Sequence, residues 1–232
     1  MIDALTAASG SMANDIARLS TISQNLTNAT TPAYKREIVV GQPFQQAMDN
    51  IAATQPSAID QRHGTLRFTG NPLDMALEGD GFFEVQTESG MAYTRQGDFR
   101  VDASGRLVTQ AGQLVQGLGG PLQWPSGTPT VDRDGRVLDG EKLVGQLKLV
   151  SFARPSELTR AGNGLFHAAE APTVLTDGAT KVRQSHLEAS NVSTASEMVK
   201  LVETMRHFEA TQKVVQGVDE MMERALRKLG EF

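Results

Sequence analysis

The apolar residues near the end of the chain recur every three or four positions. The stripe comprises Met198, Leu201, Met205, Phe208, Val215, Met222, Leu226 and Leu229, with Gln212 and Asp219 as its polar members. This heptad spacing predicts one long helix from Thr194 to Leu229, of roughly 35 residues and about 50 Å. Thr194, three residues before Glu197, predicts a capping box at its start. A helix of that length needs a long partner to cover its stripe.

The beginning of the chain supplies a matching stripe. It comprises Met1, Leu5, Ala8, Met12, Leu19, Ile22 and Leu26, with Asp15 as the one charged intruder. The pattern predicts a first helix from Ile2 to Asn28, which ends before Pro32 because proline disfavours helical geometry in the preceding residue. The simplest interpretation is a single helical hairpin of the two ends. Only Asp3, Asp15 and Arg18 are charged before Tyr34, so the outer face also suits contacts with other copies.

The middle of the chain changes to a period of two, and 18 of the 22 glycines lie between Gly64 and Gly178. Its strand candidates are Thr65–Phe68, Met75–Leu77, Phe82–Val85, Met91–Thr94, Gly145–Phe152, Gly164–Ala168 and Lys181–Leu187. We predict an α+β fold in which terminal helices form an antiparallel coiled-coil domain around a central all-β domain, an antiparallel barrel or sandwich. The predicted segments are helix 1–34, an extended connector 35–63 with one short helix, β domain 64–187 and helix 188–232.

Two similar segments, Val101–Val108 and Val131–Leu138, carry Asp and Gly between aliphatic flanks. This pattern is typical of hairpin turns. The opening of the second also resembles a calcium loop, but the twelfth loop position, where a carboxylate is required, holds Gln113 in the first segment and Leu143 in the second. Hairpins are therefore the prediction at both places.

Composition narrows the class of protein. With 39 % hydrophobic and 21 % charged residues the chain has an ordinary globular balance, and a net charge of −5 without a basic run disfavours nucleic-acid binding. No cysteine is present, which excludes disulfides and thiol chemistry. No run of about 18 apolar residues predicts membrane insertion, and the N-terminus lacks the layout of a cleaved secretory signal because its first basic residue is Arg18.

Candidate catalytic groups do not converge in the sequence. The carboxylates Asp74, Glu78, Asp80 and Glu84 cluster along the chain, but strand alternation distributes them over two faces and turns. The four histidines His63, His167, His186 and His207 have no metal-ligand spacing. We expect no enzyme, cofactor or metal. A carbohydrate-binding module on a coiled-coil stalk is an alternative, but Trp124 and Tyr93 are the only Trp and Tyr of the predicted β domain.

Several motifs together resemble a known family. Near the first helix end, Ser23-Gln24-Asn25-Leu26-Thr27-Asn28 precedes Thr31-Pro32-Ala33-Tyr34-Lys35. In the middle stand Gly64-Thr65-Leu66, Asn71-Pro72-Leu73-Asp74 and Gly81-Phe82-Phe83, and near the end Leu187 to Val192 precede Glu197-Met198 and Phe208-Glu209-Ala210. These segments resemble the motifs of bacterial flagellar rod and hook proteins over nearly the whole chain. Ala33 and Ser185 replace usual glycines, and Thr27 replaces a usual alanine.

The resemblance implies a structural subunit of the flagellar rod, closest to the proximal rod type, with distal rod or hook-type subunits as the alternative. It further implies export through the flagellar type III apparatus, a periplasmic rod location, and copies of itself and other rod subunits as partners. The family-motif residues are Asn25, Asn28, Thr31, Pro32, Tyr34, Asn71, Pro72, Leu73, Asp74, Gly81, Phe82, Phe83, Asn191 and Glu197. The expected assembly residues are Leu5, Met12, Leu19, Ile22, Leu26, Met198, Leu201, Met205, Phe208, Val215, Met222 and Leu226.

Overall fold

The computed structural model describes residues 2–39, 57–125, 127, 129–175, 178 and 180–230. The chain divides into two compact units. The first consists of Met1–Ala29, Arg36–Asp60 and Val192–Phe232, and the second of Thr30–Lys35 and Gln61–Asn191. The terminal segments therefore share one unit, while the middle of the chain forms the other.

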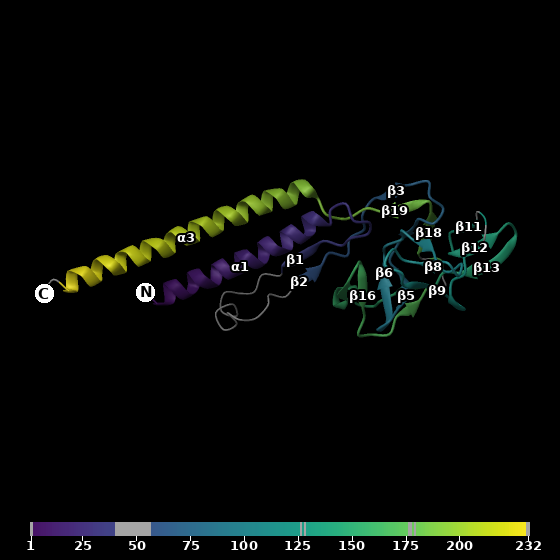
Figure 1. Cartoon of the computed structure of the whole chain (residues 1–232), viewed down its shortest axis with the longest axis horizontal. Helices are drawn as coiled ribbons and strands as arrows, with labels where there is room; N and C mark the ends of the chain where they lie inside the picture. Colours follow the sequence, from purple (N-terminus) through teal and green to yellow (C-terminus); the bar gives the residue numbers. More distant parts are fainter. Residues whose placement is uncertain are drawn as a thin grey trace. The chain divides into compact units, whose positions relative to one another are not determined.

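The first unit is a pair of long helices with a small β ribbon. Helix α1 spans Ile2–Thr27 and helix α3 spans Thr194–Gly230, and the two pack side by side (Figure 1). Strand β1 (Glu37–Val39) pairs antiparallel with β2 (Ser57–Ile59), and β1 packs on α1. The helices predicted at Ile2–Asn28 and Thr194–Leu229 are both present, whereas the wider segments 1–34 and 188–232 also contain a turn after α1 and the end of a strand before α3. The ribbon occupies part of the predicted extended connector 35–63; a short helix there would fall on residues 40–56, outside the described residues.

The start of α3 differs from the prediction of a capping box. The hydroxyl Oγ of Ser193, one residue earlier than Thr194, accepts a hydrogen bond from the Ser196 N–H at 3.4 Å. The Glu197 side chain is buried and bonds to other partners instead of returning to the helix start. The helix therefore begins with a serine cap, and Glu197, the acid of the expected capping box, pairs with Arg36 instead.

The second unit is built from short antiparallel strands. Their bounds are β3 Leu66–Phe68, β4 Met75–Glu78, β5 Phe82–Thr87, β6 Gly90–Thr94, β7 Arg100–Val101, β8 Leu107–Val108, β9 Leu114–Gly117, β10 Gly120–Pro121, β11 Thr130–Val131, β12 Arg136–Asp139, β13 Lys142–Gln146, β14 Leu149–Ser151, β15 Thr159–Gly162, β16 Leu165–His167, β17 Thr173–Val174, β18 Lys181–Gln184 and β19 His186–Glu188, with one 3₁₀ turn, η1, at Pro155–Glu157.

These strands form one large sheet and three small ones. The large sheet runs in the order β15-β16-β6-β5-β9-β8-β7, with β10, β14 and β17 attached beside that path. The small sheets are β11-β12-β13, β18-β4 and β19-β3. The predicted antiparallel β domain is thus present, but the described strands form separate sheets and do not close into a single barrel.

A continuous apolar core holds the sheets together. Phe83 and Val85 of β5 are fully buried, and Phe83 meets Phe99 edge to face at a ring distance of 5.1 Å. Trp124, the only tryptophan of the chain, lies in the same core with 9 % of its surface exposed. Edge-to-face rings stabilise such a core beyond their buried area.

Two predicted strands are each split in the structure. Lys181–Leu187 divides at Ser185, whose φ of 60° lies in the left-handed region, so β18 pairs with β4 and β19 pairs with β3. Gly145–Phe152 divides after Gln146, which ends β13. Periodicity could not show the first break, because a serine seldom adopts a left-handed backbone.

The two predicted hairpins are confirmed and share one turn design. Strands β7 and β8 pair across Asp102, and β11 and β12 pair across Asp132. In each turn the aspartate accepts backbone hydrogen bonds from residues two and four further on and pairs with the arginine four residues on, Arg106 or Arg136. The Arg106 backbone bond is the main cause that lowers the pKa of Asp102.

Candidate assembly interface

The seam between α1 and α3 follows a heptad pattern on both helices. On α3 the buried or half-buried positions include Glu197, Leu201, Thr204, Phe208, Thr211, Val215 and Val218. On α1 they include Ala8, Met12, Asp15, Leu19, Ile22, Asn25 and Leu26. Of the predicted α1 positions, Ile22 is buried, Met12, Leu19 and Leu26 are half-buried, and Leu5 is exposed.

The residues of the predicted α3 stripe do not all face α1; some are half-buried in the seam and others are exposed. Leu201, Phe208 and Val215 are half-buried, whereas Met198, Met205 and Met222 are exposed. Leu226 lies in α3, but its side chain is outside the described part of the structure. The inward line uses Glu197, Thr204, Thr211 and Val218 in place of the predicted Met198, Met205, Gln212 and Asp219.

Hydrogen bonding within α3 makes this rotation compatible with threonines in the seam. The hydroxyls of Thr204 and Thr211 donate to the backbone carbonyls of Lys200 and His207, so these threonines enter the seam without an unsatisfied polar group. The alternative rotation would bring Gln212 and Asp219 inward. Apolar spacing alone did not distinguish the two rotations.

Glu197 is the centre of a polar network at the start of α3. Its carboxylate lies 3.0 Å from both Arg36 Nε and Lys200 Nζ, and Asn25 Nδ2 approaches it at 3.4 Å. The same Asn25 side chain donates to the carbonyl of Glu37 and accepts from its N–H, both at 2.8 Å. Two motif residues thus connect α1, α3 and β1 inside the first unit.

A tight turn follows the first helix in the sequence. Asn28 caps the last turn of α1, since its Nδ2 donates to the Gln24 carbonyl at 2.9 Å. Tyr34 N–H donates to the Thr31 carbonyl at 3.3 Å, with Pro32 and Ala33 between them and Ala33 at φ 53°. Proline followed by a left-handed residue is the type II turn pattern, which favours glycine at the third position. Ala33 adopts the left-handed conformation despite its Cβ.

A second buried acid, Glu188, anchors the second unit. Its two oxygens pair with Lys35 Nζ at 2.6 Å and Arg95 Nε at 2.8 Å, and it also accepts the Gly64 N–H at 2.9 Å. Burial raises the pKa of Glu188, but the charges of Arg95 and Lys35 outweigh this and hold it below its ordinary value. Gly64 has no room for a side chain, because a Cβ would lie 1.8 Å from the Ala189 carbonyl oxygen.

The remaining motif residues are structural supports of this unit. Tyr34 is buried under the Arg160 guanidinium at 4.5 Å, and its carbonyl accepts the N–H of Asn191 at 3.2 Å. The Asn71 side chain accepts from Leu73 N–H and donates to Asp74, which forms the turn around Pro72. Phe82 and Phe83 lie in the core, and the Gly81 carbonyl accepts a bond from Arg95 at 2.7 Å.

The clustered carboxylates each have a separate partner. Asp74 bonds to Asn71, Glu78 to Arg183, Asp80 to His63 and Glu84 to Lys148. They therefore do not face one another across a cleft, as a pair of hydrolytic acids would. Within the described ranges, no three histidine or acidic side chains are grouped for a metal ion, and no helix is long and apolar enough to cross a membrane.

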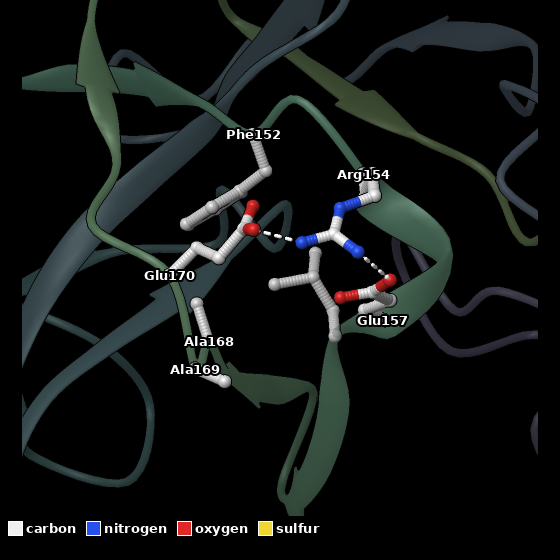
Figure 2. Close-up of a pocket in the computed structure, with 7 residues that line it drawn as sticks. Phe152, Arg154, Glu157, Ala168, Ala169 and Glu170 are labelled. Atoms are coloured by element: carbon white, nitrogen blue, oxygen red, sulfur yellow. Dashed lines mark hydrogen bonds and ion pairs between the residues drawn. The ribbon is translucent and has the colours of Figure 1, made fainter.

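One small cavity of the second unit lies beside Phe152. Figure 2 shows Arg154 between Glu157 and Glu170, with Ala168 and Ala169 along the wall. The cavity measures about 10 Å³, enough for about one water molecule. Its arginine is already paired with both carboxylates, so this place is a surface ion-pair cluster rather than a ligand site.

The sequence analysis did not identify three participants in these networks: Arg95, Glu188 as the partner of two cations, and His207. The available signal was the presence of charged residues inside otherwise buried motif segments. Such residues are seldom buried unless paired, which would have predicted partners for Lys35 and Glu188.

The described residues thus contain a pair of long helices from the two chain ends and polar networks that hold the motif residues in place. Comparison with known proteins identifies the family. The model "Flagellar basal body rod FlgEFG protein C-terminal" matches residues 183–228, and "Flagellar hook protein FlgE/F/G D1 domain" matches residues 76–138.

Curated relatives extend this similarity over almost the whole chain. "Flagellar basal-body rod protein FlgF" of Escherichia coli is 32 % identical over 97 % of both chains, and that of Mesorhizobium japonicum 32 % over 92 % of both. "Flagellar basal-body rod protein FlgG" of Bacillus subtilis is 28 % identical over 96 % of this chain and 97 % of its own. The chain belongs to the family of flagellar basal-body rod proteins, the structural subunits of the rod.

Proposed function

We propose that this rod subunit, of the proximal type, polymerises helically through its terminal helices and forms part of the shaft that carries motor torque to the hook. The main observation in support of this proposal is an apolar stripe on α3 that α1 does not cover. Met198, Val202 and Met205 stand one turn apart and are 51 %, 49 % and 48 % exposed. We assign this stripe to contacts with other copies of the chain and with neighbouring rod subunits.

The energy of this stripe suits an assembly of repeated contacts. Complete burial of such a side chain contributes about 1.5–3 kcal/mol, so covering the exposed half of three contributes about 3 kcal/mol in total. That is too little to hold two isolated subunits together against the cost of association. In a helical array the same heterologous contact recurs on every subunit, and the contributions accumulate.

The outer face of α1 suits close helix contacts. Ser9, Ala13, Ile16 and Ser20 are exposed and uncharged at three- and four-residue spacing. Ser9 Oγ donates to its own helix, at the Thr6 carbonyl, so covering it leaves no unsatisfied donor. The small side chains of Ser9, Ala13 and Ser20 let helices approach closely. We infer that helices α1 and α3 form a coiled-coil assembly module and that the second unit forms an outer β domain.

This function implies a route and a set of partners. A rod subunit of this kind reaches the periplasm through the flagellar type III export apparatus, without a cleaved signal peptide, and meets proximal-rod, distal-rod and hook-side neighbours there. It needs no catalytic activity, cofactor, nucleic acid or membrane insertion.

The test replaces Met205 in a bacterium that carries this protein as its only copy. Met205→Asp is expected to abolish incorporation into isolated basal bodies and swimming, whereas Met205→Leu, which keeps an apolar side chain, retains both. Circular dichroism of both purified variants serves as the folding control, because Met205 is exposed in the single chain. Normal basal bodies built with Met205→Asp would refute assembly through this stripe.

A further inference from the structure

In addition to Glu197, a second buried carboxylate, that of Asp15, lies in the seam of the helix pair. Asp15 is 2 % exposed, between the half-buried Met12 and Leu19 of its own helix. Its Oδ2 lies 2.6 Å from His207 Nδ1 on α3. A carboxylate without a partner in such a place is strongly unfavourable, so this single contact compensates its burial.

The apolar seam by itself does not define one alignment of the helices. On α3 the inward residues Leu201, Phe208 and Val215 repeat every seven positions, as do Thr204, Thr211 and Val218. On α1, Met12, Leu19 and Leu26 repeat in the same way. A slide of one helix by seven residues, about 10 Å, would therefore restore a similar apolar pattern.

The polar contacts select one of these alignments. Asp15 lies ten residues before Asn25, and His207 lies ten residues after Glu197, so the Asp15–His207 and Asn25–Glu197 contacts belong to one antiparallel register. A slide of α3 in one direction would place Val214 opposite Asp15. A slide in the other direction would place Lys200 opposite Asp15. Lys200 already pairs with Glu197 at 3.0 Å, so that contact would have to break.

We propose that the Asp15–His207 pair, far along the helices from the Asn25–Glu197 contact, is a register-determining contact of the terminal helix hairpin. The pair contributes little net stability, because burial costs the carboxylate its hydration, but every slipped alignment leaves that cost uncompensated or breaks the Glu197 network. A polar pair at a heptad position fixes register in coiled coils for the same reason. This role concerns the isolated chain and does not depend on assembly into a rod.

The absence of native cysteine allows a direct measurement in the full-length chain. Met12→Cys is combined with Thr211→Cys for the observed register, and with Thr204→Cys or Val218→Cys for the two slipped registers. Each double variant is treated with a short bis-maleimide in dilute solution, and the intrachain crosslink is quantified by mass spectrometry. We expect at least about a tenfold excess of the crosslink in the Met12→Cys, Thr211→Cys variant, which corresponds to about 1.4 kcal/mol between registers.

Replacements of the pair then test its role. Asp15→Leu is expected to keep the helices paired, since it adds an apolar residue, while lowering the crosslink excess, because only the Asn25–Glu197 contact then favours the observed register. Asp15→Asn, which still accepts a hydrogen bond, is the matched control and keeps the excess. An unchanged excess in Asp15→Leu, or no excess in the unaltered pair, would overturn the proposal. Trp124 fluorescence confirms in each variant that the second unit is folded.

Discussion

Glu188 offers a sharp test of how the second unit is held together, because its single carboxylate pairs with two buried cations. In Glu188→Gln the side chain keeps its shape, but Lys35 and Arg95 lose their counter-charge while their side chains stay only 1 % and 2 % exposed. Removal of one partner from a buried ion pair costs about 3–5 kcal/mol. With two cations affected, we expect a loss near the upper end of that range.

Urea unfolding of the full chain, followed by fluorescence, measures this loss selectively. Trp124 is the only tryptophan and lies in the core of the second unit, so its signal reports on that unit. The matched control is Glu157→Gln, which removes an exposed ion pair with Arg154 and should cost less than about 1 kcal/mol. A loss below about 1 kcal/mol for Glu188→Gln as well would refute the reasoning.

The same variant has a predictable pH dependence. Because the pKa of Glu188 is lower in the folded chain than its ordinary value, its ionised form contributes stability above the unfolded pKa of about 4.3. That contribution disappears as the pH falls through the folded-state pKa. The difference in unfolding free energy between the unaltered chain and Glu188→Gln should therefore be constant at neutral pH and become smaller below about pH 4. A difference that grows on acidification would contradict this sign.

Three further changes test separate features. Ser185→Gly should stabilise the second unit by about 0.5–1 kcal/mol in urea unfolding, because relief of the left-handed strain exceeds the added chain entropy; a destabilised variant would contradict this. Gly97→Ala should destabilise the unit by more than about 3 kcal/mol, since its Cβ would lie 1.5 Å from the Met75 carbonyl oxygen; an unchanged urea midpoint would show that the backbone yields. Asn25→Ala should cost about 2–4 kcal/mol by thermal melting of helical circular dichroism, because the Glu37 N–H and carbonyl both lose their partner, and a melting temperature unchanged from the parent would argue against it.

The sequence predicted the elements of this fold better than their orientation. Heptad spacing located both helices, since an apolar stripe of that length and period seldom occurs outside a long helix. It could not assign the rotation of α3, because the stripes beginning at Glu197 and at Met198 differ by one residue, and the choice depends on Asn25 and Arg36 as partners. Those partners are distant in sequence and become neighbours only through the fold.

For the strands too, the sequence predicted most elements but not their exact geometry. Period two and glycine spacing identified β3 to β6, but the break at Ser185 depends on a backbone conformation that serine rarely adopts. The motif residues were identified by resemblance, and what they do became clear from their contacts. Asn25 bonds to a backbone twelve residues further on, and Lys35 bonds to a carboxylate 153 residues away.

The long separation of the helix contacts has a consequence for the order of folding. Asn25 and Glu197 are 172 residues apart, and Asp15 and His207 are 192 apart, whereas the turns at Asp102 and Asp132 close over four residues. Contacts between such distant residues carry a large loop-closure cost and form slowly. When the chain is synthesised, its N-terminus appears first. The turns of the second unit can then form early, while Leu19 and Ile22 of α1 have no helix to pack against until α3 has been synthesised. The helix hairpin is therefore the last part of the chain to be completed.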